Sequence, residues 1–474
     1  MSVTKPRLKK IAVAAVALVV LVAGAAVAVL ARSGREVTTT SKGAYELYLK
    51  GLEDERRMYH QDALAAYAKA LELDPHFAMA TLRLAGNLAG RDRDRARSLV
   101  QCVSRNPGNL NEREKLFLAM SEADLLERDP KKFGSLVREY VRRFPDDPEG
   151  YYRLAGVLMR EGKADETLAT YERLLSLDPN QAAAYNFLGY HYIGKRDFVK
   201  GEDYLKRYRF LAPDQANPYD SLGELYANTG RYGEAEDYLK RALQIRPDFI
   251  PAIGHFGTLE FSRGHPEVAA GYFQRAADMS EGWREKAGFS VAAALSLLAA
   301  GRPDEALIEA ERLVLPASAP SSPEEFMQRF QAGRLHSVIL ALSGHADEAE
   351  AELAPLTEFP ADLAPKDREY LEKSLAGPRA AIAGARGDRE GAIRLLRALL
   401  ADEEGSRGDG FGYYPGIFDL RVRIADALVT LGRPNEARKE LQPVLSVNPR
   451  FAPALDVLAR ARGRSPAAKG SAGR

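Results

Sequence analysis

Cysteine is almost absent from the sequence: Cys102 is the single one in 474 residues. One cysteine excludes an internal disulfide and a thiolate metal cluster. Cys102 falls on the apolar side of a predicted amphipathic helix, so we expect a buried free thiol. Scarce cysteine suits an exported bacterial protein and a cytoplasmic one equally well.

The sequence also lacks the motifs that carry common enzyme chemistry. It has no HExxH pair, nucleophile elbow, P-loop or kinase catalytic loop. The glycine run in "EEGSRGDGFGYYPG" has neither a preceding strand nor a lysine–serine pair. The seven histidines show no metal-ligand spacing on one helix: His60, His76, His191, His255, His265, His336 and His345. We therefore predict a protein that is not an enzyme and that holds no cofactor or metal.

A basic stripe for nucleic acid is missing as well. Residues 1–42 carry a net charge of +6, and the rest of the chain carries −5 in mixed sign. The larger part is mildly acidic, which argues against nucleic acid as a partner.

The sequence does contain paired amphipathic segments, shown most clearly by "ANPYDSLGELYANTGRYGEAEDYLKRALQIRP" (Ala216–Pro247). Its first half places apolar or small residues at helical spacing, and its second half repeats the pattern. Between the halves, Gly230 can adopt the left-handed conformation that ends a helix. Pro247 closes the stretch, because proline lacks an amide donor. The stretch predicts a helical hairpin that needs neighbours to bury its apolar faces.

The hairpin recurs with a period of 34 residues. Prolines mark the ends of successive units at Pro145, Pro179, Pro213 and Pro247. Ten residues after each stands a small residue: Ala155, Gly189, Gly223 and Gly257. A fixed period of this length is typical of a helical-hairpin solenoid, in which each hairpin packs on copies of itself.

These units resemble the tetratricopeptide repeat. The family pattern of small residues followed by a terminal proline is matched by Gly223, Ala235, Ala242 and Pro247. Its bulky positions are matched by Tyr219, Leu222, Tyr226 and Leu239. The resemblance implies an all-α fold, a right-handed α-solenoid of helical hairpins with a concave groove.

We divide the solenoid into a regular array over residues 44–281 and a diverged array over residues 284–463. The diverged array keeps its small second-helix residues at Ala306, Ala349, Ala392 and Ala437, and a helix near Phe451–Arg462 is predicted to cap it. Three inserted loops, over residues 315–325, 355–365 and 403–416, are interpreted as spacers or as binding elements. The polar tail over residues 464–474 is predicted to be disordered.

The N-terminus predicts a membrane anchor. After a short basic segment (1–10), residues 11–31 form an uncharged run that as a helix would span about 31 Å. The basic flank predicts a cytoplasmic N-terminus, with the linker (32–43) and the repeats on the extracytoplasmic side of a bacterial inner membrane. A cleaved signal peptide and a secreted protein are the alternative; the length of the run favours the uncleaved anchor.

Residues 40–280 also resemble the extracytoplasmic repeat region of bacterial membrane-anchored serine/threonine kinases and cyclases. The likeness lies in the opening Thr40–Ala85, in "NEREKLF" and in "FPDDPE" (Phe144–Glu149). No catalytic domain is visible, because only ten residues precede the apolar run. The resemblance implies the interaction region alone.

The leading hypothesis is a membrane-anchored scaffold that binds protein or peptide partners in its groove. An accessory or sensor subunit of a signalling kinase and an envelope or cytochrome assembly factor are the alternatives. By register with the family, the groove positions are Tyr152, Asn186, Tyr190, Asp220, Glu224, Asn228, His255 and Thr258. Tyrosine and asparagine together offer flat area and hydrogen bonds that suit peptide capture.

Overall fold

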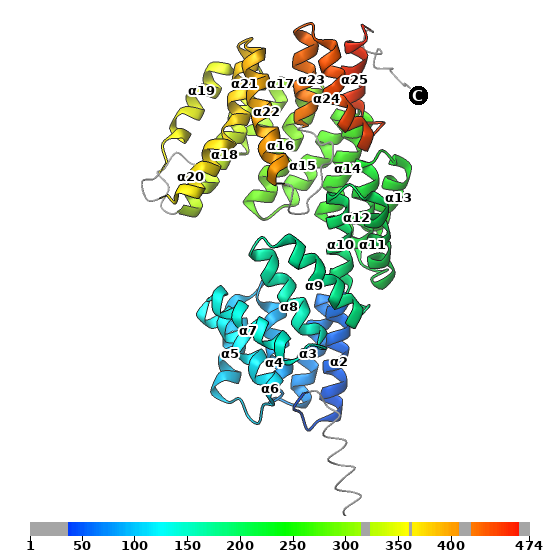
Figure 1. Cartoon of the computed structure of the whole chain (residues 1–474), viewed down its shortest axis with the longest axis vertical. Helices are drawn as coiled ribbons and strands as arrows, with labels where there is room; N and C mark the ends of the chain where they lie inside the picture. Colours follow the sequence, from blue (N-terminus) through cyan, green and yellow to red (C-terminus); the bar gives the residue numbers. More distant parts are fainter. Residues whose placement is uncertain (1–36, 314–322, 360–362, 407–418, 464–474) are drawn as a thin grey trace, which may run out of the picture. The chain divides into compact units, whose positions relative to one another are not determined.

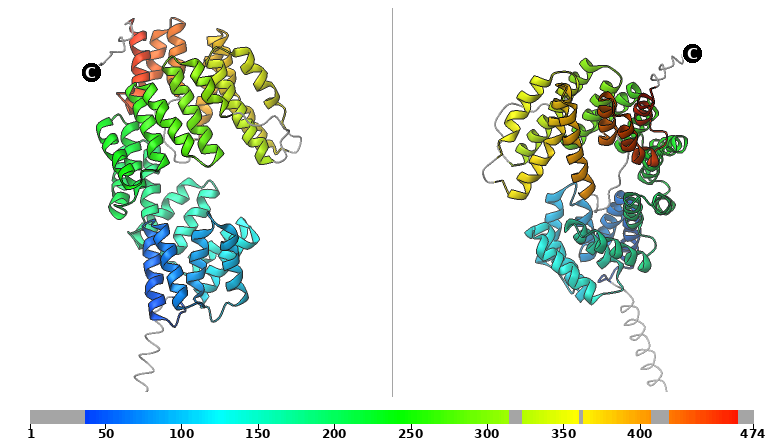
Figure 2. Two further views of the ribbon diagram at one scale, coloured as in Figure 1. Left: turned by 180° about the vertical axis from the view of Figure 1, so that it is seen from behind. Right: turned by 45° about the horizontal axis from the view of Figure 1, so that its top comes forward.

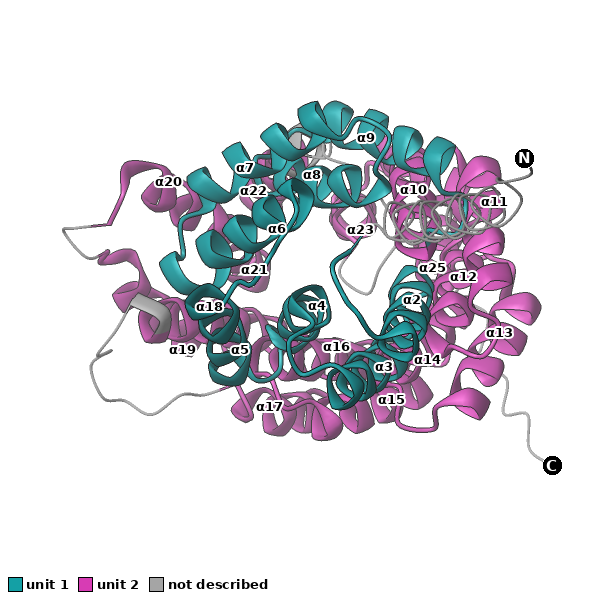
Figure 3. Ribbon diagram, turned by 90° about the horizontal axis from the view of Figure 1, so that it is seen from below, with its two compact units in different colours: residues 1–181 teal, residues 182–474 magenta. Residues whose placement is uncertain are grey.

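The computed structural model describes residues 37–313, 323–359, 363–406 and 419–463, and within them all regular structure is helical (Figure 1). The chain divides into two compact units, residues 1–181 and 182–474, coloured separately in Figure 3. The boundary falls inside the predicted regular array. Each unit is considered by itself below.

Unit 1 is built from four consecutive helical hairpins. Its helices are α2 (Lys42–Arg56), α3 (His60–Leu73), α4 (Ala78–Leu88), α5 (Arg93–Arg105), α6 (Glu112–Ser121), the π-helix η1 (Glu122–Glu127), α7 (Pro130–Arg143), α8 (Pro148–Arg160) and α9 (Ala164–Leu177). Even-numbered helices open the hairpins and odd-numbered helices close them.

Unit 2 continues the same plan and becomes irregular after α17. Its first part comprises α10 (Ala182–Gly194), α11 (Phe198–Leu211), α12 (Ala216–Asn228), α13 (Tyr232–Ile245), α14 (Ile250–Arg263), α15 (Pro266–Met279), α16 (Trp283–Ala299) and α17 (Pro303–Glu311). Its second part comprises α18 (Pro323–Leu342), α19 (Ala346–Leu353), the 3₁₀ turn η2 (Ala354–Thr357), α20 (Pro365–Ser374), α21 (Ala376–Ala385), α22 (Arg389–Ser406), α23 (Leu420–Thr430), α24 (Pro434–Val447) and α25 (Ala452–Ala461).

The hairpin α12–α13 confirms the predicted packing pattern. Gly230 has a φ of +79° at the turn, the left-handed conformation expected there. A Cβ atom on Gly223 would lie 2.7 Å from the side chain of Leu239, which is fully buried. The two helices therefore approach too closely for any larger residue at position 223. Ala235 and Ala242 are likewise fully buried.

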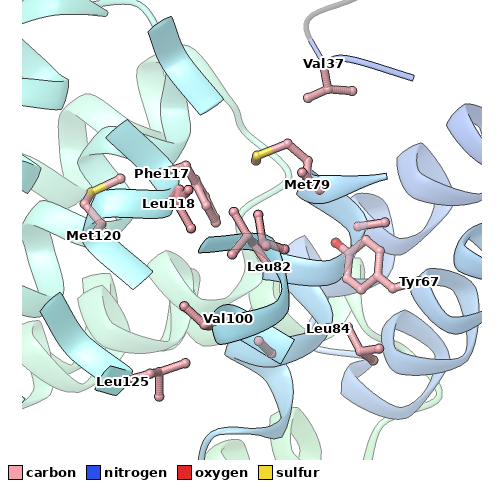
Figure 4. Close-up of a cluster of buried hydrophobic side chains, with 14 of the residues drawn as sticks. Val37, Tyr67, Met79, Leu82, Leu84, Val100, Phe117, Leu118, Met120 and Leu125 are labelled. Atoms are coloured by element: carbon pink, nitrogen blue, oxygen red, sulfur yellow. The ribbon is translucent and has the colours of Figure 1, made fainter. Parts of the chain in front are cut away.

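Unit 1 has a continuous apolar core at the centre of its hairpins. Figure 4 shows Tyr67, Leu82, Val100 and Phe117 among the side chains that gather there. Helix α4 is buried around almost its whole circumference, because its neighbouring helices and the N-terminal segment cover it. The segment "NEREKLF" forms the start of α6, and Asn111 begins this helix with a reciprocal capping box to Glu114.

The end of the predicted linker packs on unit 1 as an extended segment. Val37 is buried in the apolar core. The backbone amide and the hydroxyl of Thr38 both donate to the carboxylate of Glu114, at 2.6 Å each. The hydroxyl of Thr39 donates to Asp74 at 2.6 Å. Residues 37–39 are therefore part of the folded unit.

Helix α25 lies where the capping helix is predicted, and it has contacts beyond the last hairpin. In unit 2, α25 also contacts α14, far away in the sequence, and Figures 1 and 2 show the two helices side by side. The predicted small residues Ala306, Ala349, Ala392 and Ala437 are all buried in the hairpins of this unit.

The structure corrects the predicted burial of Cys102 and the predicted bounds of two loops. Cys102 is exposed, because the buried face of α5 carries Ala96, Val100 and Val103, and position 102 points away from them. Helix α22 extends to Ser406 and α18 begins at Pro323, so both helices take residues from the predicted loops 403–416 and 315–325. The remainder of those two loops lies outside the described residues.

The predicted membrane segment 11–31 and the tail 464–474 also lie outside the described residues. Among the helices that are described, none combines the length and the apolar character that crossing a membrane requires.

Candidate functional site

Seven of the eight predicted groove residues lie on the first helices of three consecutive hairpins in unit 2. Asn186 and Tyr190 belong to α10. Helix α12 carries Asp220, Glu224 and Asn228, and helix α14 carries His255 and Thr258. Tyr152 belongs to α8, in unit 1.

Two of these residues meet across neighbouring repeats. Tyr190 and Glu224 occupy the same repeat position, 34 residues apart, and the Tyr190 hydroxyl donates to Glu224 Oε2 at 2.7 Å. The shared position explains the contact, since equivalent first-helix residues of stacked hairpins face the same side of the solenoid.

A second pair adjoins the first. His255 Nδ1 lies 2.8 Å from Asp220 Oδ1, and its Nε2 lies 3.8 Å from Glu224 Oε2. Asp220 is only 2% exposed, whereas the side chains of Glu224 and His255 are partly open to solvent. Tyr190, Asp220, Glu224 and His255 thus form one connected group from three helices, which we call the polar cluster.

The charges of the polar cluster follow from its geometry. Burial opposes the charged imidazolium, but Asp220 and Glu224 outweigh this effect and raise the pKa of His255 to about 9. Burial, reinforced by the adjacent Glu224 carboxylate, raises the pKa of Tyr190 well above its ordinary value. At neutral pH the cluster therefore holds an imidazolium beside the acidic groups of Asp220 and Glu224, and a neutral phenol that donates a hydrogen bond.

The polar cluster is consequently rich in acceptors and has more acidic than basic groups. Asn186, one helical turn before Tyr190, adds a buried Oδ1 without a hydrogen-bond donor. Such an arrangement favours a ligand group that donates hydrogen bonds or carries positive charge.

The other predicted residues do not join the polar cluster. Asn228 is buried near the end of α12. The Thr258 hydroxyl faces the carbonyl of Gly254 in its own helix, at 3.4 Å. Tyr152 is 44% exposed on unit 1.

Sequence reasoning missed a buried ionic network on the first helices of unit 1. Arg83 pairs with Glu55 at 3.1 Å and with Glu149 at 2.8 Å, and Arg153 pairs with Glu149 at 2.6 Å. The guanidinium groups of Arg83 and Arg153 also lie over the ring of Phe117, at 4.8 and 4.2 Å from its centroid. The signal was present as one arginine in the otherwise apolar "AMATLRLAGNL" of α4.

The unit 1 network balances its own charges. Burial opposes ionisation of Glu149, but Arg83 and Arg153 outweigh it and lower the pKa of Glu149 to about 2. Burial raises the pKa of Glu55, an effect that Arg83 opposes. Each acidic group of the network faces a guanidinium, so no group is left for a ligand. We interpret this network as structural, in contrast to the polar cluster of unit 2.

A metal is not suggested by the polar cluster. In the part of the chain that the structure describes, no group of His, Cys, Asp and Glu side chains has an arrangement able to hold a metal ion.

Two family models, both described as tetratricopeptide repeat, match the sequence. One covers residues 216–249, and the other covers residues 135–182, 152–216 and 256–323. The chain contains tetratricopeptide repeats. The first match coincides with the hairpin α12–α13.

A search of solved structures found several matches of low sequence identity, of which three follow. PilW, described as a widely conserved type IV pilus biogenesis factor, is 21% identical with a TM-score of 0.38, over 45% of this chain and 96% of its own. A tetratricopeptide repeat protein from Parabacteroides merdae is 17% identical with a TM-score of 0.38, over 56% and 98%. Yeast Tom70 is 16% identical with a TM-score of 0.39, over 89% and 95%. Similarity at this level carries no information about function.

A comparison with curated proteins found no match.

Proposed function

We propose that this protein is a membrane-anchored scaffold that binds a protein partner through the tetratricopeptide groove of α10, α12 and α14. The observation that carries the proposal is the polar cluster, in which four side chains from three successive first helices converge. The balanced network of unit 1 leaves no group for a ligand, whereas the polar cluster has more acidic than basic groups, and its Glu224 and His255 side chains are partly open to solvent. The proposed ligand is an extended or helical peptide segment.

The charge of the polar cluster supports a partner segment that is positively charged. The excess of acidic over basic groups and the buried Oδ1 of Asn186, which has no hydrogen-bond donor, favour a lysine or arginine side chain in the bound segment. Tyr190 would supply a flat contact surface beside that cation, since aromatic side chains are frequent anchors at interfaces.

The membrane anchor in this proposal is supported by the apolar run over residues 11–31 and its basic flank. Residues 37–39 pack directly on unit 1, which leaves only residues 32–36 between the run and the folded repeats. Five extended residues span at most about 18 Å, so the anchor would hold unit 1 near the membrane surface. The bacterial inner membrane, with the repeats on its extracytoplasmic side, is the proposed location.

The binding experiment uses the purified full chain in detergent and two synthetic probes. One probe is a 12-residue peptide of alanine with interspersed lysine, and the other replaces lysine with glutamate. We expect the lysine peptide to bind the parent protein and to lose affinity at high salt. The substitution Glu224→Lys should abolish this binding, whereas Glu267→Lys, an equal charge change at an exposed position of α15, should preserve it.

The result that overturns the groove proposal is equal binding of the lysine peptide by the parent and by Glu224→Lys. A further proposal, based on the resemblance to kinase-associated regions, is an accessory subunit of a signalling kinase. In-cell crosslinking from a photoreactive residue at position 186 separates the two functions: a kinase in the crosslinked product supports the accessory subunit.

A further inference from the structure

The turn between α24 and α25 packs on the turn between α12 and α13, over 200 residues away. Asn448 is fully buried at this contact. Its Nδ2 donates to the carbonyl oxygen of Ala227 at 3.3 Å. Its Oδ1 accepts at 3.2 Å from the Tyr232 hydroxyl, which shares its hydrogen with the Ser262 carbonyl at 3.0 Å. The same side chain also accepts from the backbone amide of Arg450 at 3.1 Å.

The surrounding residues fit this contact closely. A Cβ atom on Gly230 would lie 2.6 Å from Asn448 Oδ1. The guanidinium of Arg450 lies 4.8 Å from the centroid of the Tyr232 ring and donates to the Gly230 carbonyl at 3.4 Å. The rings of Phe261 and Phe451 are 6.5 Å apart between centroids.

The repeat pattern alone does not account for this contact. A solenoid requires each hairpin to contact only its neighbours. Several equivalent turn glycines in unit 2 also have positive φ, yet nothing lies within 4 Å of an added Cβ atom: Gly301, Gly344, Gly387 and Gly432. Gly230 therefore meets a partner that these four turns lack.

We propose that unit 2 is a closed superhelical turn, held by a contact between Ala227–Tyr232 and Asn448–Phe451, which we call the closing contact. We also propose that the closing contact sets the distances between the first helices that line the groove, α10, α12 and α14. Helix α12 ends at the closing contact and carries Asp220 and Glu224. Helix α14 meets α25 beside it and carries His255. Opening the contact would free the ends of both helices and move three of the four polar-cluster residues.

Asn448 and Arg450 supply the polar bonds of the closing contact, beside an apolar cluster that includes Phe261 and Phe451, so a partner can act on the contact through a few polar bonds. Asn448 alone bonds to two residues of the distant turn. A partner that requires a wider groove would have to break these bonds, whereas a partner that fits the closed groove meets it preorganised. This coupling to binding rests on the proposed function, while the closure itself does not.

The decisive variant is Asn448→Asp. Aspartate serves the local role of this turn position elsewhere in the chain, since Asp74 and Asp178 accept from the amides of His76 and Asn180. It cannot donate to the Ala227 carbonyl, and it places negative charge against that oxygen. Gly230→Ala breaks the same contact by a clash, and Gly432→Ala is its matched control, with φ of +73° and open space.

The distance across the closing contact is measured by pulsed electron spin resonance on the full chain in detergent. Spin labels are placed at the exposed positions Lys240 and Lys439, in α13 and α24, on a Cys102→Ser background. We expect one narrow distance distribution in the parent and in Gly432→Ala. Asn448→Asp and Gly230→Ala should broaden it and lengthen the mean distance by several ångströms.

Unchanged distributions in both closing-contact variants, with folding verified by circular dichroism, would overturn the closure. The alanine–lysine peptide then tests the coupling, with at least a threefold change in affinity expected for Asn448→Asp. A longer distance with unchanged affinity would overturn the coupling alone. Absence of peptide binding in the parent counts against the proposed function, while the distance measurement still decides the closure.

Discussion

Tyr190 donates its hydroxyl hydrogen to Glu224 at 2.7 Å, and the two residues hold the same position in consecutive repeats. The 34-residue period of the sequence thus brings these two side chains into contact. Because His255 of the following hairpin also reaches Glu224, three hairpins share one electrostatic unit. Substitutions in the polar cluster should therefore affect both peptide binding and the stability of the fold, and separate measurements can distinguish the two effects.

Tyr190→Phe tests the hydrogen bond without removing the ring. The substitution leaves Glu224 more free to bind a cation, because its carboxylate loses one donor. We expect affinity for the lysine peptide to be kept or modestly increased, whereas Tyr190→Ala should cost about 2 kcal/mol through loss of the flat contact surface. Titration calorimetry measures both. Equal affinities for Phe and Ala would show that the ring does not contact the peptide.

The protonation of His255 should appear in the pH dependence of stability. The pKa of His255 is raised from 6.5 to about 9, so its contribution is fully present below pH 6.5 and is lost as pH rises through 9. A shift of this size corresponds to roughly 3 kcal/mol. Chemical denaturation between pH 6 and pH 10 should show this loss in the parent and a weaker one in His255→Gln. Parallel pH profiles of the two proteins would contradict the assignment.

Any residue larger than glycine at position 223 should destabilise the hairpin α12–α13. Gly223→Leu must displace the buried Leu239 and should cost about 1–3 kcal/mol or more, and Ala235→Leu should behave likewise. Gly233→Ala, on the facing helix of the same hairpin with open space around an added Cβ atom, should be neutral or stabilising by about 0.5–1 kcal/mol.

The set of helices that Gly223→Leu destabilises tests the closing contact. In an open solenoid the loss of hydrogen-exchange protection would be confined to the hairpins adjacent to α12 and α13. Because Asn448 bonds to the turn between α12 and α13, we expect α24 and α25 to lose protection as well. Full protection of α24 and α25 in a destabilised Gly223→Leu variant would contradict this expectation.

Arg83 should be indispensable to unit 1. Arg83→Leu leaves Glu55 and Glu149 buried without their shared cation, which should cost about 3–5 kcal/mol. Hydrogen exchange should report loss of protection in α2, α4 and α8. Arg95→Leu, at an exposed position of α5, serves as the control and should have no comparable effect.

The topology predicted from the N-terminal charges can be tested in spheroplasts. An added protease should digest the repeats and leave a short membrane-bound fragment that contains residues 11–31. Protection of the repeats until the membrane is permeabilised would place them in the cytoplasm instead.

The sequence alone determined the hairpins and their packing, because both depend on neighbours along the chain. Gly223 against Leu239, the left-handed Gly230 and the capping box of Asn111 and Glu114 are local consequences of a period and of turn chemistry. The proximity of Tyr190 and Glu224 follows from the same period.

Only the tertiary structure decided what lies beyond a neighbouring repeat. The bond from Tyr232 to Asn448 depends on the small rotation between successive hairpins, which accumulates over the whole of unit 2 and has no signature at any single residue. The buried ions around Arg83 depend on how four first helices converge, and exposed Cys102 depends on which face of α5 turns inward. Periodicity fixes local geometry, but the sum of many small rotations fixes which distant surfaces meet.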